Sequence, residues 1–433
     1  MLLKSTITKD LNNRLFYWTS STVTQQLQND NGASADNTTT STTTTTTTTN
    51  TPSSDVITTI YNTAIPLIAT PTTKMGGYQF FRDVLKSPKH IVAPMIDHTF
   101  LAFRMLCRKY NADLVYTPMF HSKNYANDAT YRLENFEICK EDRPLVVQFC
   151  GNEVEHIVKA ALMVESQCDA VDINLGCPQI VAKKGHYGAF LLEQPEIVLP
   201  MVRELHKRLS IPVFCKIRLL PNLEDTIKLA LQLQEAGCQL LTVHGRTKEQ
   251  KGKLSGVANW KAIKAVKDAL SIPVIANGSV LEYDDIDECL KETTADGVMS
   301  AEGILANPAM FSGKNIPVTQ ICHDFLDMCE QYPTQHWIIR SHFFKLLRKD
   351  CEVYEDLRSK LNNVFTVAEF RGVLVELEQR HREGVPAIKQ MTNKEKRELL
   401  AKQKLLEQEA IAAAAAAASV SSTDSSSTNT HQA

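Results

Sequence analysis

Short apolar runs alternate with amphipathic segments through the middle of the chain. The runs are rich in β-branched residues, and we expect strands over 91–95, 114–119, 145–150, 170–175, 213–219, 240–244, 273–277 and 297–301. The segments between them repeat apolar residues at helical spacing, and we expect helices over 154–165, 195–209, 223–235, 260–270 and 284–291. Eight strands that alternate with helices are typical of a (β/α)8 TIM barrel, an α/β fold.

An open, doubly wound sheet is the other fold that alternates strands with helices. A sheet of this kind that binds a dinucleotide carries a Gly-x-Gly-x-x-Gly turn directly after its first strand. Here Ile96, Asp97 and His98 follow the first predicted strand, without such glycines. The barrel is therefore the prediction, over residues 85–312.

The pattern changes on both sides of this barrel. Residues 1–75 are polar and hold a nearly continuous threonine tract, a composition typical of a disordered leader. Residues 316–384 are expected to form a small domain of consecutive helices, over 318–330, 337–349, 353–362 and 367–380. Residues 392–433 are charged, then Ala-rich and Ser-rich, and we expect a disordered tail.

Composition excludes several classes of protein. The 433 residues carry a formal net charge of −2, so there is no overall attraction to nucleic acid. The eleven cysteines form no Cys-x-x-Cys pair, which argues against a disulfide framework, a zinc site or an iron–sulfur cluster, and we expect no metal. Free thiols suit a reducing compartment, so a cytoplasmic or nuclear location is expected. No apolar stretch has the length of a membrane span, and we expect no membrane contact.

Positive charge gathers locally between His244 and Lys267. This segment carries seven Lys and Arg residues against one acid, Glu249. A run of this kind is either a solvated surface or a surface that contacts phosphate groups, and composition leaves both open.

Polar residues interrupt the apolar runs near the carboxyl ends of the predicted strands, where the active site of a (β/α)8 barrel lies. They include Gln148, Asn174, Lys216, Arg218, His244, Arg246 and Asn277, and Cys177 follows in a Gly-Cys-Pro turn. Burying one such group without a partner costs roughly 1–3 kcal/mol, so several of them at one end of the barrel predict a ligand.

These residues also have simpler interpretations. Lys216 and Arg218 lie on one face of a strand, where they either form a buried ion pair or hold an anionic or electron-accepting ligand. His244 is either a core histidine or a ligand contact. Cys177 is either a structural thiol or, because a turn exposes it, a reactive one.

Small residues follow the last two predicted strands. Asn277-Gly278-Ser279 and Ala301-Glu302-Gly303 lie where many barrels bind phosphate through backbone N–H groups and a helix N-terminus. Each turn is a weak signal by itself, and the pair at these two places favours a phosphate-bearing ligand.

An ordered set of motifs is similar to that of the tRNA-dihydrouridine synthase family. The motifs are Ile91-Val92-Ala93-Pro94-Met95, Tyr116-Thr117-Pro118-Met119, Val147-Gln148-Phe149, Asn174-Leu175-Gly176-Cys177-Pro178, Cys215-Lys216-Ile217-Arg218, His244-Gly245-Arg246-Thr247 and Asn277-Gly278. The resemblance covers about residues 85–312. Residues 179–191, 246–250 and 300–303 are most similar to the eukaryotic synthase 1 branch, which reduces uridines 16 and 17 of the tRNA D-loop.

The resemblance implies an oxidoreductase that reduces uridine in tRNA to 5,6-dihydrouridine, with FMN as cofactor and NADPH as electron donor. Hydride would pass from the flavin to C6 of uracil, and Cys177 would donate a proton to C5 as general acid. The implied flavin contacts are Pro94, Met95, Ile96, Gln148, Lys216, His244, Asn277, Gly278, Ser279, Ala301 and Glu302. The implied substrate contacts are Asn174, Arg218 and Arg246.

A uridine in folded tRNA must leave its stack to reach such a site. The resemblance therefore favours phosphate contact for the basic segment 244–267. A second basic surface that contacts tRNA is expected in the helical domain, formed by Arg340, His342, Lys345, Arg348 and Lys349. We expect the protein to act as a monomer.

Two other functions fit parts of the same pattern. One is an FMN barrel that acts on a free pyrimidine, such as a dihydroorotate dehydrogenase, but a free base gives no purpose to the helical domain and the basic loops. The other is a non-catalytic RNA-binding protein on a barrel that has lost its activity. Cys177, Lys216 and His244 are all present, which favours an enzyme.

Overall fold

The computed structural model describes residues 74–384 and residue 402. The expected leader and tail lie outside the described residues, apart from residues 74, 75 and 402. Eight parallel strands form a closed barrel in sequence order, so the predicted TIM barrel is confirmed. They are β1 (His90–Val92), β2 (Leu114–His121), β3 (Leu145–Cys150), β4 (Ala170–Leu175), β5 (Val213–Leu219), β6 (Cys238–Thr247), β7 (Val274–Asn277) and β8 (Gly297–Ser300).

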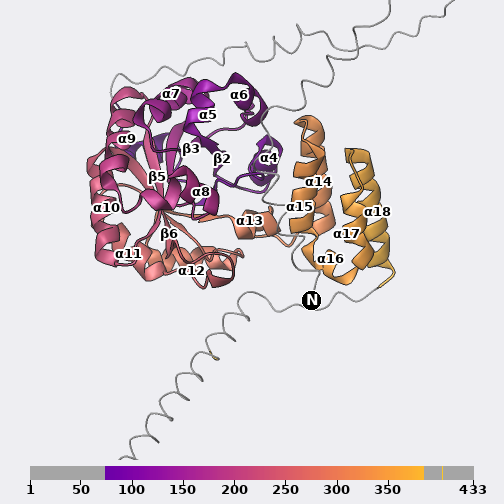
Figure 1. The fold of residues 1–433 in the computed structure, drawn as a ribbon. Helices are drawn as coiled ribbons and strands as arrows, with labels where there is room; N and C mark the ends of the chain where they lie inside the picture. The colour runs from indigo at the N-terminus through magenta and orange to yellow at the C-terminus, as the bar shows by residue number, and fades with distance from the viewer. Residues whose placement is uncertain (1–73, 385–401, 403–433) are drawn as a thin grey trace, which may run out of the picture. The chain divides into compact units, whose positions relative to one another are not determined.

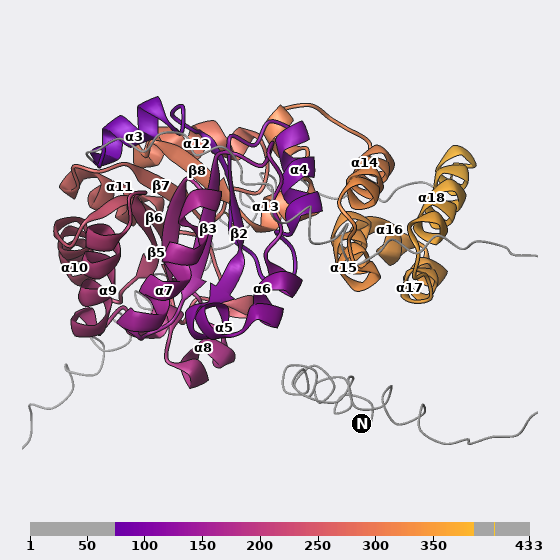
Figure 2. The same cartoon turned by 90° about the horizontal axis from the view of Figure 1, so that it is seen from above.

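Helices surround the strands, as Figure 2 shows from above. The outward strand residues pack against them in one large buried core, to which Val147, Val171, Ile217 and Val243 belong. The helices of the barrel are α3 (Gly77–Asp83), α4 (Leu101–Lys109), α5 (Ser122–Asn127), α6 (Ala129–Asn135), α7 (Val154–Val164), α8 (Ile180–Gly185), α9 (Pro195–Arg208), α10 (Leu223–Glu235), α11 (Trp260–Ala269), α12 (Asp284–Thr293) and α13 (Glu302–Ala306).

The inside of the barrel changes from apolar to polar along the strands. Every second strand residue faces inward, and near the amino ends these are apolar and buried: Ile91, Leu114, Val146, Ala170, Phe214, Leu240, Ile275 and Met299. Two residues further along, the same face carries Gln148, Asp172, Lys216, Thr242 and Asn277. The alternation of the strands therefore places an apolar floor beneath a polar layer.

A short helix that the sequence pattern did not predict closes the amino end of the barrel. Helix α3 inserts Phe80 and Phe81 among the apolar inward residues. The Phe80 ring packs edge-on against Phe214, with 6.3 Å between the ring centroids. Seven residues make only two helical turns, which is too few for a helical period to stand out in the sequence.

Five helices follow the barrel: α14 (Val318–Gln331), α15 (His336–Leu346), α16 (Arg348–Val353), α17 (Glu355–Asn362) and α18 (Val367–Arg382). Figure 1 shows them, in orange to yellow, beside α4. Phe103 of α4 packs edge-on against Phe325 of α14, and Lys109 pairs with the buried Asp324 at 2.8 Å. The single helix predicted over 337–349 is divided into α15 and α16 at Leu347.

Among the helices that the structure describes, none combines the length and the apolar character needed to cross a membrane.

Replacing Phe80 by alanine should lower the free energy of unfolding by about 3–5 kcal/mol, because it leaves a cavity in the floor of the barrel. The Phe80 side chain is 8% exposed, whereas Val375 on α18 is 56% exposed. Val375→Ala is the control and should change the unfolding free energy by no more than about 0.5 kcal/mol. Urea unfolding followed by circular dichroism measures both, and equal effects would show that α3 does not close the barrel core.

Candidate active site

The predicted site residues of β3 to β7 meet inside the barrel at its carboxyl end. Lys216 of β5 donates a hydrogen bond from Nζ to Asn277 Oδ1 of β7 at 2.9 Å. Strand β6 lies between β5 and β7, so these two side chains reach each other only across the interior. The polar inward layer is therefore one continuous site.

Two side chains from neighbouring strands hold the turn that carries Cys177. Asn174 Oδ1 accepts hydrogen bonds from the backbone N–H groups of Gly176 at 3.1 Å and Cys177 at 2.9 Å. Arg218 Nε donates to the Gly176 carbonyl oxygen at 2.8 Å from the other side. From the next loop, Lys251 Nζ donates to the Pro178 carbonyl oxygen at 2.6 Å. The half-buried thiol therefore sits in a turn that is fixed on both sides.

The thiol is protonated at neutral pH. Burial raises the pKa of Cys177 above its ordinary value, against the lowering effects of a backbone hydrogen bond at Gln179 and of Arg218, Lys216 and Lys251. A protonated thiol is a proton donor rather than a nucleophile.

Lys216 is a half-buried cation that forms no salt bridge with a carboxylate within residues 74–384. Burial and the nearby Arg218 lower its pKa to about 8, and Asp172 and Cys177 act against this. The interpretation as a buried ion pair is therefore not supported, since the ammonium group donates to the neutral amide of Asn277. Lysine carries three donor hydrogens, which leaves two for a ligand.

His244 and Arg246 form the other wall of the site with Ser279. Arg246 Nη1 donates to His244 Nε2 at 3.0 Å, and its Nη2 donates to Ser279 Oγ at 3.1 Å. Burial and the cations Lys216, Arg218 and Arg246 lower the pKa of His244 far below its ordinary value, so the imidazole is neutral. With Nε2 as acceptor, its proton lies on Nδ1.

Gly278 makes this packing possible. Its φ is +105°, and a Cβ atom there would lie 2.8 Å from Cδ2 of His244. The histidine therefore rests directly on the backbone of the turn after β7.

The remaining predicted flavin contacts lie around the rim. Pro94 and Met95 are half-buried after β1, and Ile96 is exposed. Ala301 precedes α13 and is half-buried, while Glu302 is exposed. The Glu302 carboxylate is near enough to Arg246 to raise the pKa of that guanidinium, which burial lowers.

Asp172 was not predicted from the sequence, although it lies in the middle of the site. Its carboxyl group is fully buried, and Oδ2 accepts a hydrogen bond from Gln148 Nε2 at 2.8 Å. Burial raises its pKa to about 7, while the Gln148 hydrogen bond and Lys216 act to lower it. The signal was available, since Asp172 shares the inward face of its strand with Asn174.

The basic segment 244–267 is not one surface. Lys251 and Lys253 lie in the loop after β6 at the carboxyl end of the barrel, close to the Cys177 turn. Lys267 lies at the opposite end of α11, where it bonds Tyr78 and Asp296, and Lys264 pairs with Asp268. Lys264 and Lys267 use their charge on partners within the protein, so the structure gives no support to phosphate contact for either of them.

Two residues of the basic surface expected in the helical domain bind backbone carbonyl groups of the protein instead. His342 is fully buried, and its Nε2 donates to the His98 carbonyl oxygen at 3.0 Å. Arg340 donates to the carbonyl oxygens of Leu361 at 2.9 Å and Val364 at 2.7 Å. Lys345, Arg348 and Lys349 are exposed, and Lys345 lies near enough to His98 to affect its pKa.

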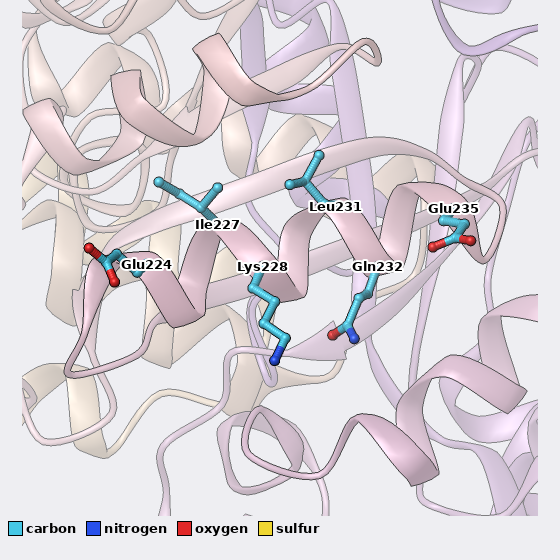
Figure 3. Close-up of a pocket in the computed structure, with 6 residues that line it drawn as sticks. All are labelled: Glu224, Ile227, Lys228, Leu231, Gln232 and Glu235. Carbon is cyan, nitrogen blue, oxygen red and sulfur yellow. The ribbon is translucent and has the colours of Figure 1, made fainter.

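A surface hollow lies away from this site, along α10 (Figure 3). Figure 3 shows Ile227 and Leu231 on one side of the helix and Lys228 and Gln232 on the other. Every residue that lines the hollow belongs to this one helix, and none is a predicted site residue.

The barrel and its polar mouth define a (β/α)8 enzyme scaffold with a cation-rich site around a protonated thiol. A model of the dihydrouridine synthase (Dus) family matches residues 91–413. The chain therefore belongs to the dihydrouridine synthase family.

Curated relatives are similar over 60–68% of this chain. A Mus musculus protein named as a tRNA-dihydrouridine(16/17) synthase, NAD(P)(+)-like, is 48% identical over 296 residues, 68% of this chain and 62% of its own. The tRNA-dihydrouridine(16/17) synthase of Saccharomyces cerevisiae is 44% identical over 304 residues, 66% of this chain and 72% of its own. A Mus musculus tRNA-dihydrouridine(20a/20b) synthase-like protein is 37% identical over 262 residues, 60% of this chain and 80% of its own. The chain thus spans less than two thirds of the first mouse protein.

Replacing Gly188 by alanine should displace the Cys177 turn. The φ of Gly188 is +67°, and a Cβ atom there would lie 2.7 Å from the Cys177 carbonyl oxygen. The left-handed conformation alone costs an alanine about 1–2 kcal/mol. We therefore expect lower stability in urea unfolding and a changed rate of Cys177 alkylation, measured by mass spectrometry.

Gly372 is the matched control for Gly188. It lies within α18 with nothing within 4 Å of its Cβ position, so alanine there should raise stability by about 0.5–1 kcal/mol. Unchanged Cys177 alkylation in both variants would contradict the role of Gly188.

Proposed function

We propose that this protein reduces uridines 16 and 17 of tRNA to 5,6-dihydrouridine, using FMN and NADPH. The observation that carries the proposal is the protonated Cys177 thiol, held by Asn174 and Arg218 in the mouth of a barrel of this family. The mouse and yeast proteins named as 16/17 synthases support the choice of uridines, since they are 48% and 44% identical to this chain. The proposal includes a monomer in the cytoplasm or nucleus.

The residues of the mouth fit FMN. Lys216 offers a half-buried ammonium group with two further donor hydrogens, and Gln148 and Asn277 add amide groups on the same inward face. Gly278 and Ser279 form the turn after β7, on which His244 packs closely because Gly278 has no side chain. Pro94, Met95 and Ile96 after β1 and Ala301 and Glu302 after the neighbouring strand β8 complete the proposed cofactor contacts. A reduced flavin bound there supplies the hydride for C6 of uracil.

Cys177 supplies the proton for C5. Its raised pKa keeps the thiol protonated at neutral pH, and its turn is fixed by Asn174 and Arg218. The cation-rich wall of Lys216, Arg218 and Arg246 stabilises the negative charge that grows on uracil O4 as reduction proceeds. Asn174 uses one amide hydrogen on Gln148 Oε1 and keeps a second for the edge of the base.

The surface around the mouth suits the tRNA backbone. Lys251 contacts the Cys177 turn, Lys253 follows it in the same loop, and Lys345 lies near the loop after β1. Flipping a uridine into the site costs a few kcal/mol, which contacts of this kind with phosphate offset.

Incubating the purified protein with NADPH and tRNA that lacks dihydrouridine should produce dihydrouridine at positions 16 and 17, mapped by primer extension. Cys177→Ala should bind FMN and tRNA normally and lose activity by about 10²–10⁴-fold, because it lacks the general acid. Cys351→Ala, a half-buried thiol on α16, is the control and should stay active. Full activity of Cys177→Ala would contradict the acid role, and a protein that takes up no FMN would contradict the function.

Lys253 should contribute one phosphate contact. The logarithm of tRNA affinity should fall linearly with the logarithm of salt concentration, and Lys253→Ala should reduce that slope by about 0.7–0.9. Lys264→Ala is the matched control, because Lys264 pairs with Asp268 on α11. Filter binding at salt concentrations from roughly 50 to 300 mM measures the slopes. Equal slopes for Lys253→Ala and the unaltered protein would remove this loop from the tRNA surface.

A further inference from the structure

Asp172 is a buried carboxyl group to which the proposed reaction gives no task. It lies on β4 inside the barrel, two residues before Asn174 on the same face, and it is fully buried. Oδ2 accepts the hydrogen bond from Gln148 Nε2, and Oδ1 has no hydrogen-bond partner among the described residues. A buried carboxyl with a free oxygen is costly, so its presence at this position needs a physical reason.

A chain of hydrogen bonds joins this carboxyl group to the Cys177 turn. Gln148 Nε2 donates to Asp172 at 2.8 Å, and Asn174 Nδ2 donates to Gln148 Oε1 at 2.8 Å. Asn174 Oδ1 then accepts from the backbone N–H of Cys177 at 2.9 Å. Three side chains therefore connect the inside of the barrel to the thiol-bearing turn.

The two ends of this chain permit only one orientation of the two amides between them. An ionised carboxylate only accepts hydrogen bonds, so Gln148 must turn its NH2 group toward Asp172 and its oxygen toward Asn174. Backbone N–H groups only donate, so Asn174 must turn its oxygen toward Cys177 and its NH2 group toward Gln148. Asp172 at one end and the Cys177 turn at the other therefore require the same orientation of the Gln148 and Asn174 amides.

Rotating either amide by half a turn breaks this agreement. It sets oxygen against oxygen at Asp172, or NH2 against N–H at Cys177, and leaves buried polar groups unpaired. Protonation of Asp172 does not change the orientation, because the proton can occupy the free Oδ1 while Oδ2 still accepts from Gln148.

We propose that Asp172 is a positioning residue, which acts through Gln148 and Asn174 to hold the Cys177 turn in one conformation. The consequence for catalysis rests on the proposed function, because there Cys177 is the proton donor. The positioning itself concerns the turn and can be measured without substrate.

The first measurement is the alkylation rate of Cys177 by iodoacetamide, followed by mass spectrometry on the full chain. Asp172→Leu removes the acceptor, so the Cys177 turn becomes less rigid. We expect the alkylation rate to rise about tenfold, because one hydrogen bond that restrains the turn is lost. Asp172→Asn keeps an acceptor of nearly the same shape and should restore most of the protection. In the FMN-bound enzyme, Asp172→Leu should lower kcat about tenfold with little change in the KM for tRNA.

Asp169→Asn is the matched control. Asp169 precedes the same strand at the opposite end of the barrel, where it pairs with Arg143 at 2.7 Å and accepts from the Leu145 N–H. This variant should lose stability without changing Cys177 alkylation. If Asp172→Leu and Asp169→Asn changed the alkylation equally, loss of stability would explain both and the proposal would be overturned.

A double-mutant cycle tests the path of the effect. In an Asn174→Ala background the chain is already broken, so adding Asp172→Leu should leave the alkylation rate unchanged. Independent, multiplying effects of the two substitutions would overturn the proposal. This readout does not depend on tRNA, so it stands even if Cys177→Ala proves active and the acid role fails. Asp172→Ala, which also removes the acceptor, takes the place of Asp172→Leu in the cycle if Asp172→Leu does not fold.

Discussion

The closed ring of eight parallel strands holds every proposed functional side chain in its place. Because a strand turns every second residue inward, the interior has layers, and the sequence fills them differently. The layer near the amino ends is apolar and is sealed by Phe80 and Phe81 of α3. The layer above it is polar, and its members have nowhere to point except toward one another and toward a ligand.

Closure of the barrel also allows contacts that no open sheet would offer. Lys216 on β5 bonds Asn277 on β7 although β6 separates the two strands. Such contacts across the interior give the lysine a defined position without neutralising its charge. Arg218 and Arg246 likewise donate mainly to carbonyl oxygens, and within residues 74–384 neither forms a salt bridge. The mouth therefore keeps a positive field, which suits an anionic cofactor and a tRNA backbone.

The Cys177 turn shows how the fold combines rigidity with exposure. Its backbone is held by Asn174 and Arg218, and Gly188 packs against it from the following segment because it has no side chain. The thiol itself is only half-buried, and its raised pKa comes mainly from burial. A proton donor needs both properties, since it must stay protonated and must still reach its substrate.

The sequence by itself determined the barrel and the identity of most site residues. Strands β3, β4 and β5 and helix α10 have the predicted bounds, because the strands are apolar runs, the helix has a clear helical period, and turn residues border each of them. The roles of these side chains depended on partners far along the chain. Gln148 meets Asp172 and Asn174 after 24 and 26 residues, and Lys216 meets Asn277 after 61.

Only the tertiary structure decided which polar residues face the ligand and which serve the fold. His342 and Arg340 are basic residues in a basic segment, yet packing buries the first and backbone carbonyls bind the second. Lys264 and Lys267 continue a basic run in sequence, but in the fold each pairs with a carboxylate of the protein, Asp268 and Asp296. A linear pattern records the type and spacing of side chains, whereas burial, charge pairing and the direction of a hydrogen bond arise only when distant segments meet.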